Sequence, residues 1–145
     1  MSDTPSNAQT IHPSFLFLVR VTIALIWLYE GLWQKIVAQD AHELSIVQQF
    51  SATLDGARQL MTYIGCAETL LALGVLIGLF ARILSWFQIV VLVAMNLTGI
   101  FFGRGTIAQP VSLIIHNLPL LLCMSLIGIY GPGAFAPESR RRRGE

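Results

Sequence analysis

The stretch from Phe15 to Ile36 constrains the fold more than any other part of the chain. A helix that crosses a bilayer needs about 20 mostly apolar residues, and this run supplies them. Its last third, from Trp27 to Lys35, reads Trp-Leu-Tyr-Glu-Gly-Leu-Trp-Gln-Lys and places the carboxylate of Glu30 among aromatic residues. An ionisable side chain inside a span costs at least roughly 2.5–3.5 kcal/mol, so Glu30 should face other helices or a cavity and should have a partner.

The composition extends this prediction to the whole chain. Hydrophobic residues make up 54% of the sequence and charged residues 12%, whereas about a quarter of a soluble domain is charged. Apolar runs predict four spans, at about residues 15–36, 59–80, 81–102 and 111–130. We therefore expect an all-α integral membrane protein, a bundle of four transmembrane helices that occupies residues 15–130.

The segments outside the spans are polar. Residues 1–14 predict a flexible N-terminal tail in which Pro13 is suited to opening the first helix, and residues 131–145 form a basic C-terminal tail. In the first loop, Asp40 and Glu43 have the spacing of a capping box. This pattern predicts a short amphipathic helix that Gly56 ends.

The arginine distribution predicts the orientation. Four spans place both termini on one side of the membrane. A cytoplasmic location leaves Arg20, Arg82 and the arginines from Arg140 to Arg143 inside, which is the favoured asymmetry, and it directs the first loop outward. Arg20 is then expected to snorkel to the cytoplasmic interface.

Polar residues of all four spans fall at one predicted depth. With a rise of about 1.5 Å per residue from the outward ends of the spans, Glu30 lies at about 9 Å, Asn96 and His116 at about 10 Å, Asn117 at about 12 Å and Glu68 at about 13 Å. These side chains predict a polar layer beneath the outer membrane surface.

Two interpretations of this layer remain open. In a structural one, Glu30 and Glu68 bond to Asn96, His116, Asn117 or Lys35 and fix the helix register. In a functional one, the layer lines a pocket that opens to the outer leaflet and binds a quinone head group, a small polar molecule or a metal. A protonatable carboxylate near a histidine suits quinol chemistry, because oxidation of a quinol releases protons as well as electrons.

Other residue patterns narrow the function classes. His116 is the sole histidine within a span, so the paired ligands of a membrane b-type haem are not present, and a hydrogen-bonding role is favoured over a metal site. Tyr29 belongs to an interfacial aromatic belt or stacks on a quinone ring. Nothing in the sequence suggests nucleic-acid binding or a covalently bound cofactor. The small-residue pair Gly74 and Gly78 indicates either close packing within the bundle or a contact in a homo-oligomer.

Three motifs together resemble the DoxX-like family of small four-span bacterial membrane proteins. They are the run from Trp27 to Lys35, the series Gly65, Glu68, Gly74, Gly78 and Arg82, and the sequence Asn-Leu-Pro-Leu-Leu from Asn117 to Leu121. The resemblance covers about residues 15–130. In the family a basic residue often precedes Asn-Leu-Pro, and His116 occupies that position here.

The resemblance implies a protein of the bacterial inner membrane. The family is named for a subunit associated with thiosulfate:quinone and terminal quinol oxidation, and some relatives resemble partners of detoxifying redox enzymes. It thus implies a quinone-linked accessory subunit that acts with a redox enzyme partner. Distant animal relatives are similar to chaperones or cargo receptors, so a non-enzymatic assembly factor, chaperone or small-molecule carrier is the alternative.

Overall fold

The computed structural model describes residues 11–102 and 110–137, and every regular element in these ranges is helical. The elements in chain order are α1 (Pro13–Leu28), the π-helical η1 (Tyr29–Val37), α2 (Ala41–Val47), the 3-10 turn η2 (Gln48–Phe50), α3 (Leu54–Ile77), α4 (Ala81–Phe102) and α5 (Pro110–Tyr130). The segments Pro13–Val37, Leu54–Ile77, Ala81–Phe102 and Ser112–Tyr130 are long and apolar enough to cross a membrane. The predicted all-α bundle of four spans is confirmed.

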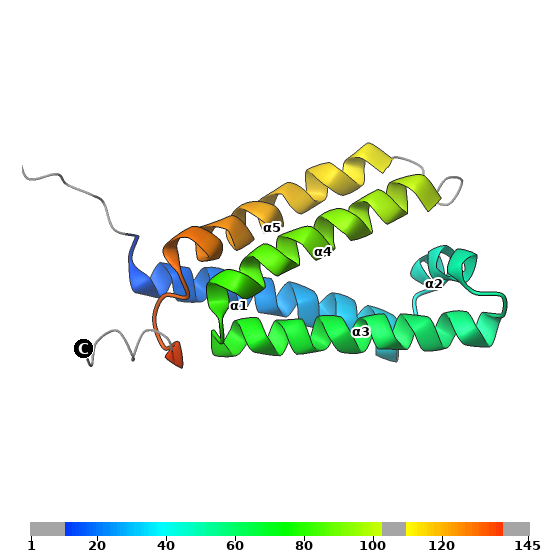
Figure 1. Ribbon diagram of the computed structural model, residues 1–145, viewed down its shortest axis with the longest axis horizontal. Helices are drawn as coiled ribbons and strands as arrows, with labels where there is room; N and C mark the ends of the chain where they lie inside the picture. The colour runs from blue at the N-terminus through cyan, green and yellow to red at the C-terminus, as the bar shows by residue number, and fades with distance from the viewer. Residues whose placement is uncertain (1–10, 103–109, 138–145) are drawn as a thin grey trace, which may run out of the picture.

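The bundle consists of two antiparallel helix pairs (Figure 1). The continuous helix α1–η1 packs along α3, and α4 packs along α5. The pairs lie close together where α3 turns into α4 and move apart toward the end that carries α2 (Figure 1). The start of α1 and the end of α5 lie at the same end of the bundle, as an even number of spans requires; their cytoplasmic location remains a prediction.

The first loop differs from the prediction. Its short helix begins at Asp40 as expected, since the Asp40 carboxylate accepts hydrogen bonds from the backbone N–H groups of His42 and Glu43 at 2.9 and 3.1 Å. The prediction that it runs to Gly56 is wrong, because η2 ends at Phe50 and the Thr53 hydroxyl accepts from Gly56 N at 3.1 Å to open α3. The second span accordingly begins at Leu54 rather than 59.

Arg20 does not snorkel to the membrane interface. Its side chain is 1% exposed and donates to the carbonyl oxygens of Pro132 at 2.9 Å and Ala134 at 3.3 Å. Gly131 and Gly133 have positive φ angles, which turn the segment after α5 back over the start of α1. This turn brings the two carbonyl groups to Arg20. These carbonyl groups pair Nη1 and Nη2 of the guanidinium inside the protein, whereas its buried Nε has no hydrogen-bond partner in the described ranges. Part of the predicted C-terminal tail is thus ordered, while Arg140–Arg143 and residues 1–10 lie outside the described residues.

Gly74 and Gly78 make their close contacts within the chain. Gly78 ends α3 in the left-handed conformation, with φ of 76°, and packs against Arg20. A Cβ atom on Gly74 would lie 2.7 Å from Cδ2 of Leu84 on α4. Close packing within the bundle therefore accounts for both glycines. A homo-oligomer remains an expectation, but this glycine pair does not support it.

The core lies where the two helix pairs meet. Its buried members come from α1, α3, α4 and α5 and include Ile23, Ala24, Trp27, Ala72, Val75, Ala81, Leu92, Met124 and Ile127. Large apolar side chains elsewhere on these helices point outward, as expected for surfaces that contact lipid. Four spans thus enclose a narrow interior in which a few polar side chains are buried.

Candidate functional site

Two glycines bring the first and second spans into backbone contact. A Cβ atom on Gly31 of η1 would lie 2.7 Å from Cβ of Glu68 and 2.8 Å from the carbonyl oxygen of Gly65. A Cβ atom on Gly65 of α3 would lie 2.6 Å from the carbonyl oxygen of Gly31. Small residues permit such an approach between membrane helices. Lys35 of η1 and Glu68 of α3 flank this crossing. Because the two helices are so close, their side chains face each other across a short distance.

Lys35 joins two carboxylates at this crossing. Its Nζ atom lies 3.0 Å from Oε2 of Glu43 on α2 and 3.0 Å from Oε2 of Glu68 on α3. The side chains of Lys35 and Glu68 are 4% and 3% exposed, whereas that of Glu43 is 27% exposed. Lys35 therefore has an inner partner, Glu68, that is buried within the protein, and an outer partner, Glu43, that reaches the surface.

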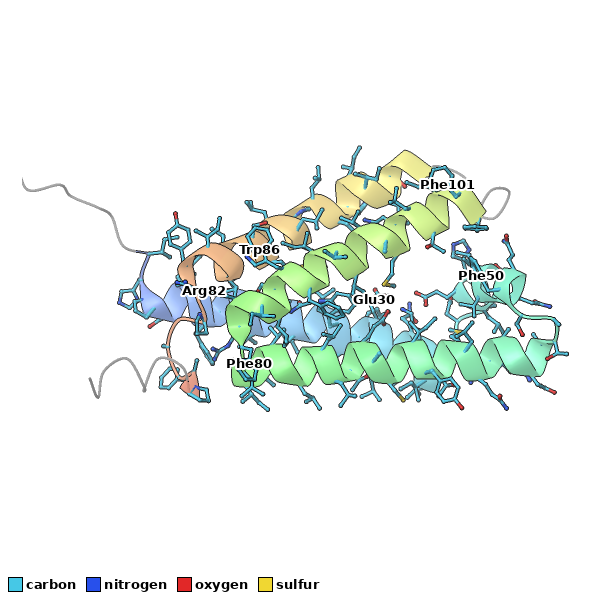
Figure 2. The ribbon with its side chains drawn as sticks, in the orientation of Figure 1. Glu30, Phe50, Phe80, Arg82, Trp86 and Phe101 are labelled. Atoms are coloured by element: carbon cyan, nitrogen blue, oxygen red, sulfur yellow. The ribbon has the colours of Figure 1, made fainter. Side chains whose placement is uncertain are left out.

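Glu30 completes what we call the Lys35 cluster, which consists of Glu30, Lys35, Glu43 and Glu68. The half-buried Glu30 carboxyl group lies within hydrogen-bonding reach of the Glu43 carboxyl group and interacts electrostatically with Lys35. Figure 2 shows Glu30 on the side of η1 that faces α4. Three carboxyl groups thus surround one ammonium group, so a proton or another positive charge would reduce the excess of negative charge in the cluster.

One acceptor of the cluster is not used. Oε1 of Glu68 is buried and has no hydrogen-bond partner among the residues that the structure describes, although Oε2 contacts Lys35. Leaving a buried acceptor unpaired costs about 1–3 kcal/mol. Native proteins pair nearly all such atoms, so a buried exception marks a place where a ligand or proton can add a bond.

The other predicted site residues lie apart from this cluster. Asn117 Nδ2 donates to Oδ1 of Asn96 at 2.7 Å, which links α5 to α4. His116 is exposed, and its Nδ1 lies 2.6 Å from the carbonyl oxygen of Ser112 in the same helix. Tyr29 is 53% exposed on the outer surface of η1. Of the partners considered for Glu30 and Glu68, Lys35 is present, and the expectation that His116 or Asn117 fills this role is wrong because their bonds stay within the α4–α5 pair.

Two relevant residues were not among the predicted site residues. Glu43 was expected to complete a capping box, but its side chain instead pairs with Lys35. Its position shortly after the end of the first span was the sequence feature that could have indicated this pairing. Gln88 of α4 is fully buried. Within residues 11–102 and 110–137, no group of three His, Cys, Asp or Glu side chains could hold a metal ion.

The fold and the cluster define a class, a multi-pass membrane protein of four helices with a buried polar site at the crossing of its first two spans. The family model of the DoxX-like family matches residues 24–125, a range that contains Glu30, Lys35, Glu43 and Glu68. The chain belongs to the DoxX-like family. No curated protein and no solved structure matches it.

Proposed function

We propose that this protein is a quinone-linked redox accessory subunit of the bacterial inner membrane, in which the Lys35 cluster accepts a proton from a quinol. The observation that carries the proposal is the state of Glu68. One of its carboxylate oxygens is held by Lys35, and the other is buried without a hydrogen-bond partner in the part of the chain that the structure describes. A positioned carboxylate with a free acceptor is the group that a general base requires.

The cluster also offers a route for the proton. Oxidation of a quinol to a quinone releases two electrons and two protons. Glu68 would receive the two protons one after the other in the interior, and the adjoining Glu30–Glu43 pair, whose outer member is 27% exposed, would pass each of them to water. The two electrons would go to a partner oxidoreductase that carries a metal or flavin centre.

A non-enzymatic role is the second candidate, and the burial of the ion pair favours it. The Lys35 and Glu68 side chains are 4% and 3% exposed, so the inner half of the cluster is closed by protein. A closed network of this kind holds helices in register, as an assembly factor, a chaperone or a small-molecule carrier would need. In that case the exposed α2 and its loop would contact the partner.

Binding of a quinone to the purified protein separates the two candidates. The protein would be placed in nanodiscs and titrated with a benzoquinone that carries a ten-carbon tail, in the oxidised and the reduced form. Glu68→Gln and Glu30→Gln remove the proton-accepting carboxylates with little change in shape. We expect both to weaken quinol binding and to abolish its pH dependence.

Asp55→Asn is the matched control, because Asp55 is an acid with a side chain that is 90% exposed near the outer end of α3. It should bind the quinol as the unchanged protein does. Equal binding by all four proteins would refute a role for the cluster, and absence of saturable binding in the unchanged protein would refute the quinone-linked function itself.

A further inference from the structure

Two buried side chains in the bundle core carry polar atoms without partners. Gln88 of α4 is 0% exposed, and neither its Oε1 nor its Nε2 has a hydrogen-bond partner in the described ranges. Trp27 of α1 is 3% exposed, and its indole Nε1 is likewise unpaired there. Both belong to the interior that the two helix pairs enclose, and neither takes part in the Lys35 cluster.

The helix contacts place these two side chains at one height. Between α1–η1 and α3, Arg20 packs against Gly78. Farther along, Gly31 packs against Gly65 and Glu68. Trp27 therefore lies opposite about residue 71 of α3. Along α3 and α4, Gly74 packs against Leu84, so Gln88 lies opposite about residue 70. One residue of helix rises about 1.5 Å, which puts Trp27 and Gln88 at nearly the same level.

The same register places Glu68 just above them. Glu68 lies two to three residues farther along α3 toward the outer end, a rise of about 3–5 Å. Glu68, whose Oε1 lacks a partner among the described residues, is therefore a buried acidic residue close to the level of Trp27 and Gln88. Buried groups of three helices that lack partners among the described residues thus lie at similar heights in the interior, and each would cost stability if it stayed unpaired.

The donors and acceptors define the ligand that would pair them. The Trp27 indole can only donate, the Gln88 amide can donate and accept, and the Glu68 carboxylate oxygen accepts. A matching group must accept from an N–H group and, when reduced, donate to an oxygen atom. A quinone carbonyl meets the first condition, and a quinol hydroxyl meets both.

We propose that Trp27 and Gln88 form the hydrogen-bonding site for one head-group oxygen of the quinone, directly below Glu68. The inference rests on the proposed function and locates its substrate within the bundle, between α1, α3 and α4. The head group would replace missing hydrogen bonds, and its hydroxyl proton would face the free oxygen of Glu68.

Tryptophan fluorescence tests this location because the chain contains three tryptophans. In the double variant Trp33→Phe/Trp86→Phe, Trp27 is the remaining fluorophore. The variant Trp27→Phe/Trp33→Phe leaves Trp86, which is 51% exposed on α4 (Figure 2), and because it lacks the Trp27 indole it serves only as the reference for quenching by quinone dissolved in the lipid. In nanodiscs, the decyl benzoquinone should quench Trp27 along a saturating curve and Trp86 in proportion to its concentration in the lipid.

Gln88→Leu supplies a second measurement. Loss of a hydrogen bond to the head group should weaken quinone binding about three- to tenfold. Gln59→Leu, at an exposed position of α3, is its control and should bind normally. Without a ligand, Gln88→Leu should also raise the unfolding temperature, since it removes an unpaired buried amide.

The outcomes separate this inference from the proposed function. Saturable quinone binding that depends on Glu68, with unchanged affinity in Gln88→Leu and no saturable quenching of Trp27, would overturn the location and leave the function standing. It would assign the unpaired atoms to buried water. Absence of saturable binding in the unchanged protein would overturn both.

Discussion

Replacing Lys35 with methionine should destabilise the protein more than any other single substitution in the cluster. Methionine keeps the length and apolar stem of lysine and removes the ammonium group. Glu68, with a side chain that is 3% exposed, would then lose its cation and would have no route to water. Removal of one partner from a buried ion pair costs about 3–5 kcal/mol, and we expect Lys35→Met to lower the free energy of unfolding by that amount.

The second contact of Lys35 should contribute much less. The Glu43 side chain is 27% exposed and can turn toward water when its partner is removed. Exposed ion pairs contribute about 0.2–1 kcal/mol, so Glu43→Gln should fall within or slightly above this range. The difference between the two variants therefore measures the burial of Glu68 rather than the number of ion pairs.

Unfolding by SDS in mixed detergent micelles gives these free energies when it is followed by the fluorescence of the buried Trp27 in the Trp33→Phe/Trp86→Phe background. The decisive variant is Lys35→Met/Glu68→Met, in which both charges are removed. Since buried pairs replaced by apolar side chains are often neutral or stabilising, the double variant should recover most of the lost stability. A double variant no more stable than Lys35→Met, or a single variant within about 0.5 kcal/mol of the original, would refute the reasoning.

Three further predictions address the packing around the site. Gly65→Ala should destabilise the protein by about 1–3 kcal/mol in the same assay, because its new methyl group would meet the Gly31 carbonyl, whereas Gly74→Ala meets a flexible leucine and should cost less. Arg20→Met should expose the segment after α5 to limited proteolysis, since two carbonyl groups lose their donor; an unchanged cleavage pattern would contradict this. Asn96→Leu and Asn117→Leu should each cost about 1–3 kcal/mol, and the double variant should cost less than their sum, because each single change leaves a buried amide unpaired.

The sequence predicted the spans well because hydropathy and length decide which segments enter lipid. It also predicted that Glu30 and Glu68 need partners, and it offered Lys35 as one of four candidates beside Asn96, His116 and Asn117. It could not predict which way neighbouring side chains point. His116 and Asn117 differ by one position and about 100° around the helix axis, so one faces outward and the other bonds Asn96.

Two further differences between the prediction and the structure have the same cause. In each, a side chain meets a distant part of the chain that local sequence patterns do not reveal. Arg20 was assigned to the interface because a lone arginine near the end of a span usually lies there, yet the turn after α5 brings carbonyl groups to it. Glu43 was assigned to helix capping because its neighbours suited that role, yet α2 packs against α3 and Glu43 pairs with Lys35. In both cases the partner lies on an element whose position depends on the whole bundle.

The π-helical segment explains why Lys35 faces Glu68 at all. In an α-helix, eight residues turn about 80° beyond two full turns, so Lys35 would face away from the side that Trp27 buries. An α-helix would present Gln34 there, seven residues after Trp27 and within about 20° of it. In η1 the backbone bonds span five residues, as from Ala38 N to the Trp33 carbonyl oxygen at 2.7 Å, so each residue turns less and the buried positions become Trp27, Gly31 and Lys35. The wider turns thus place an ammonium group over Glu68 where a regular helix would place a neutral amide, which could not balance the buried carboxylate.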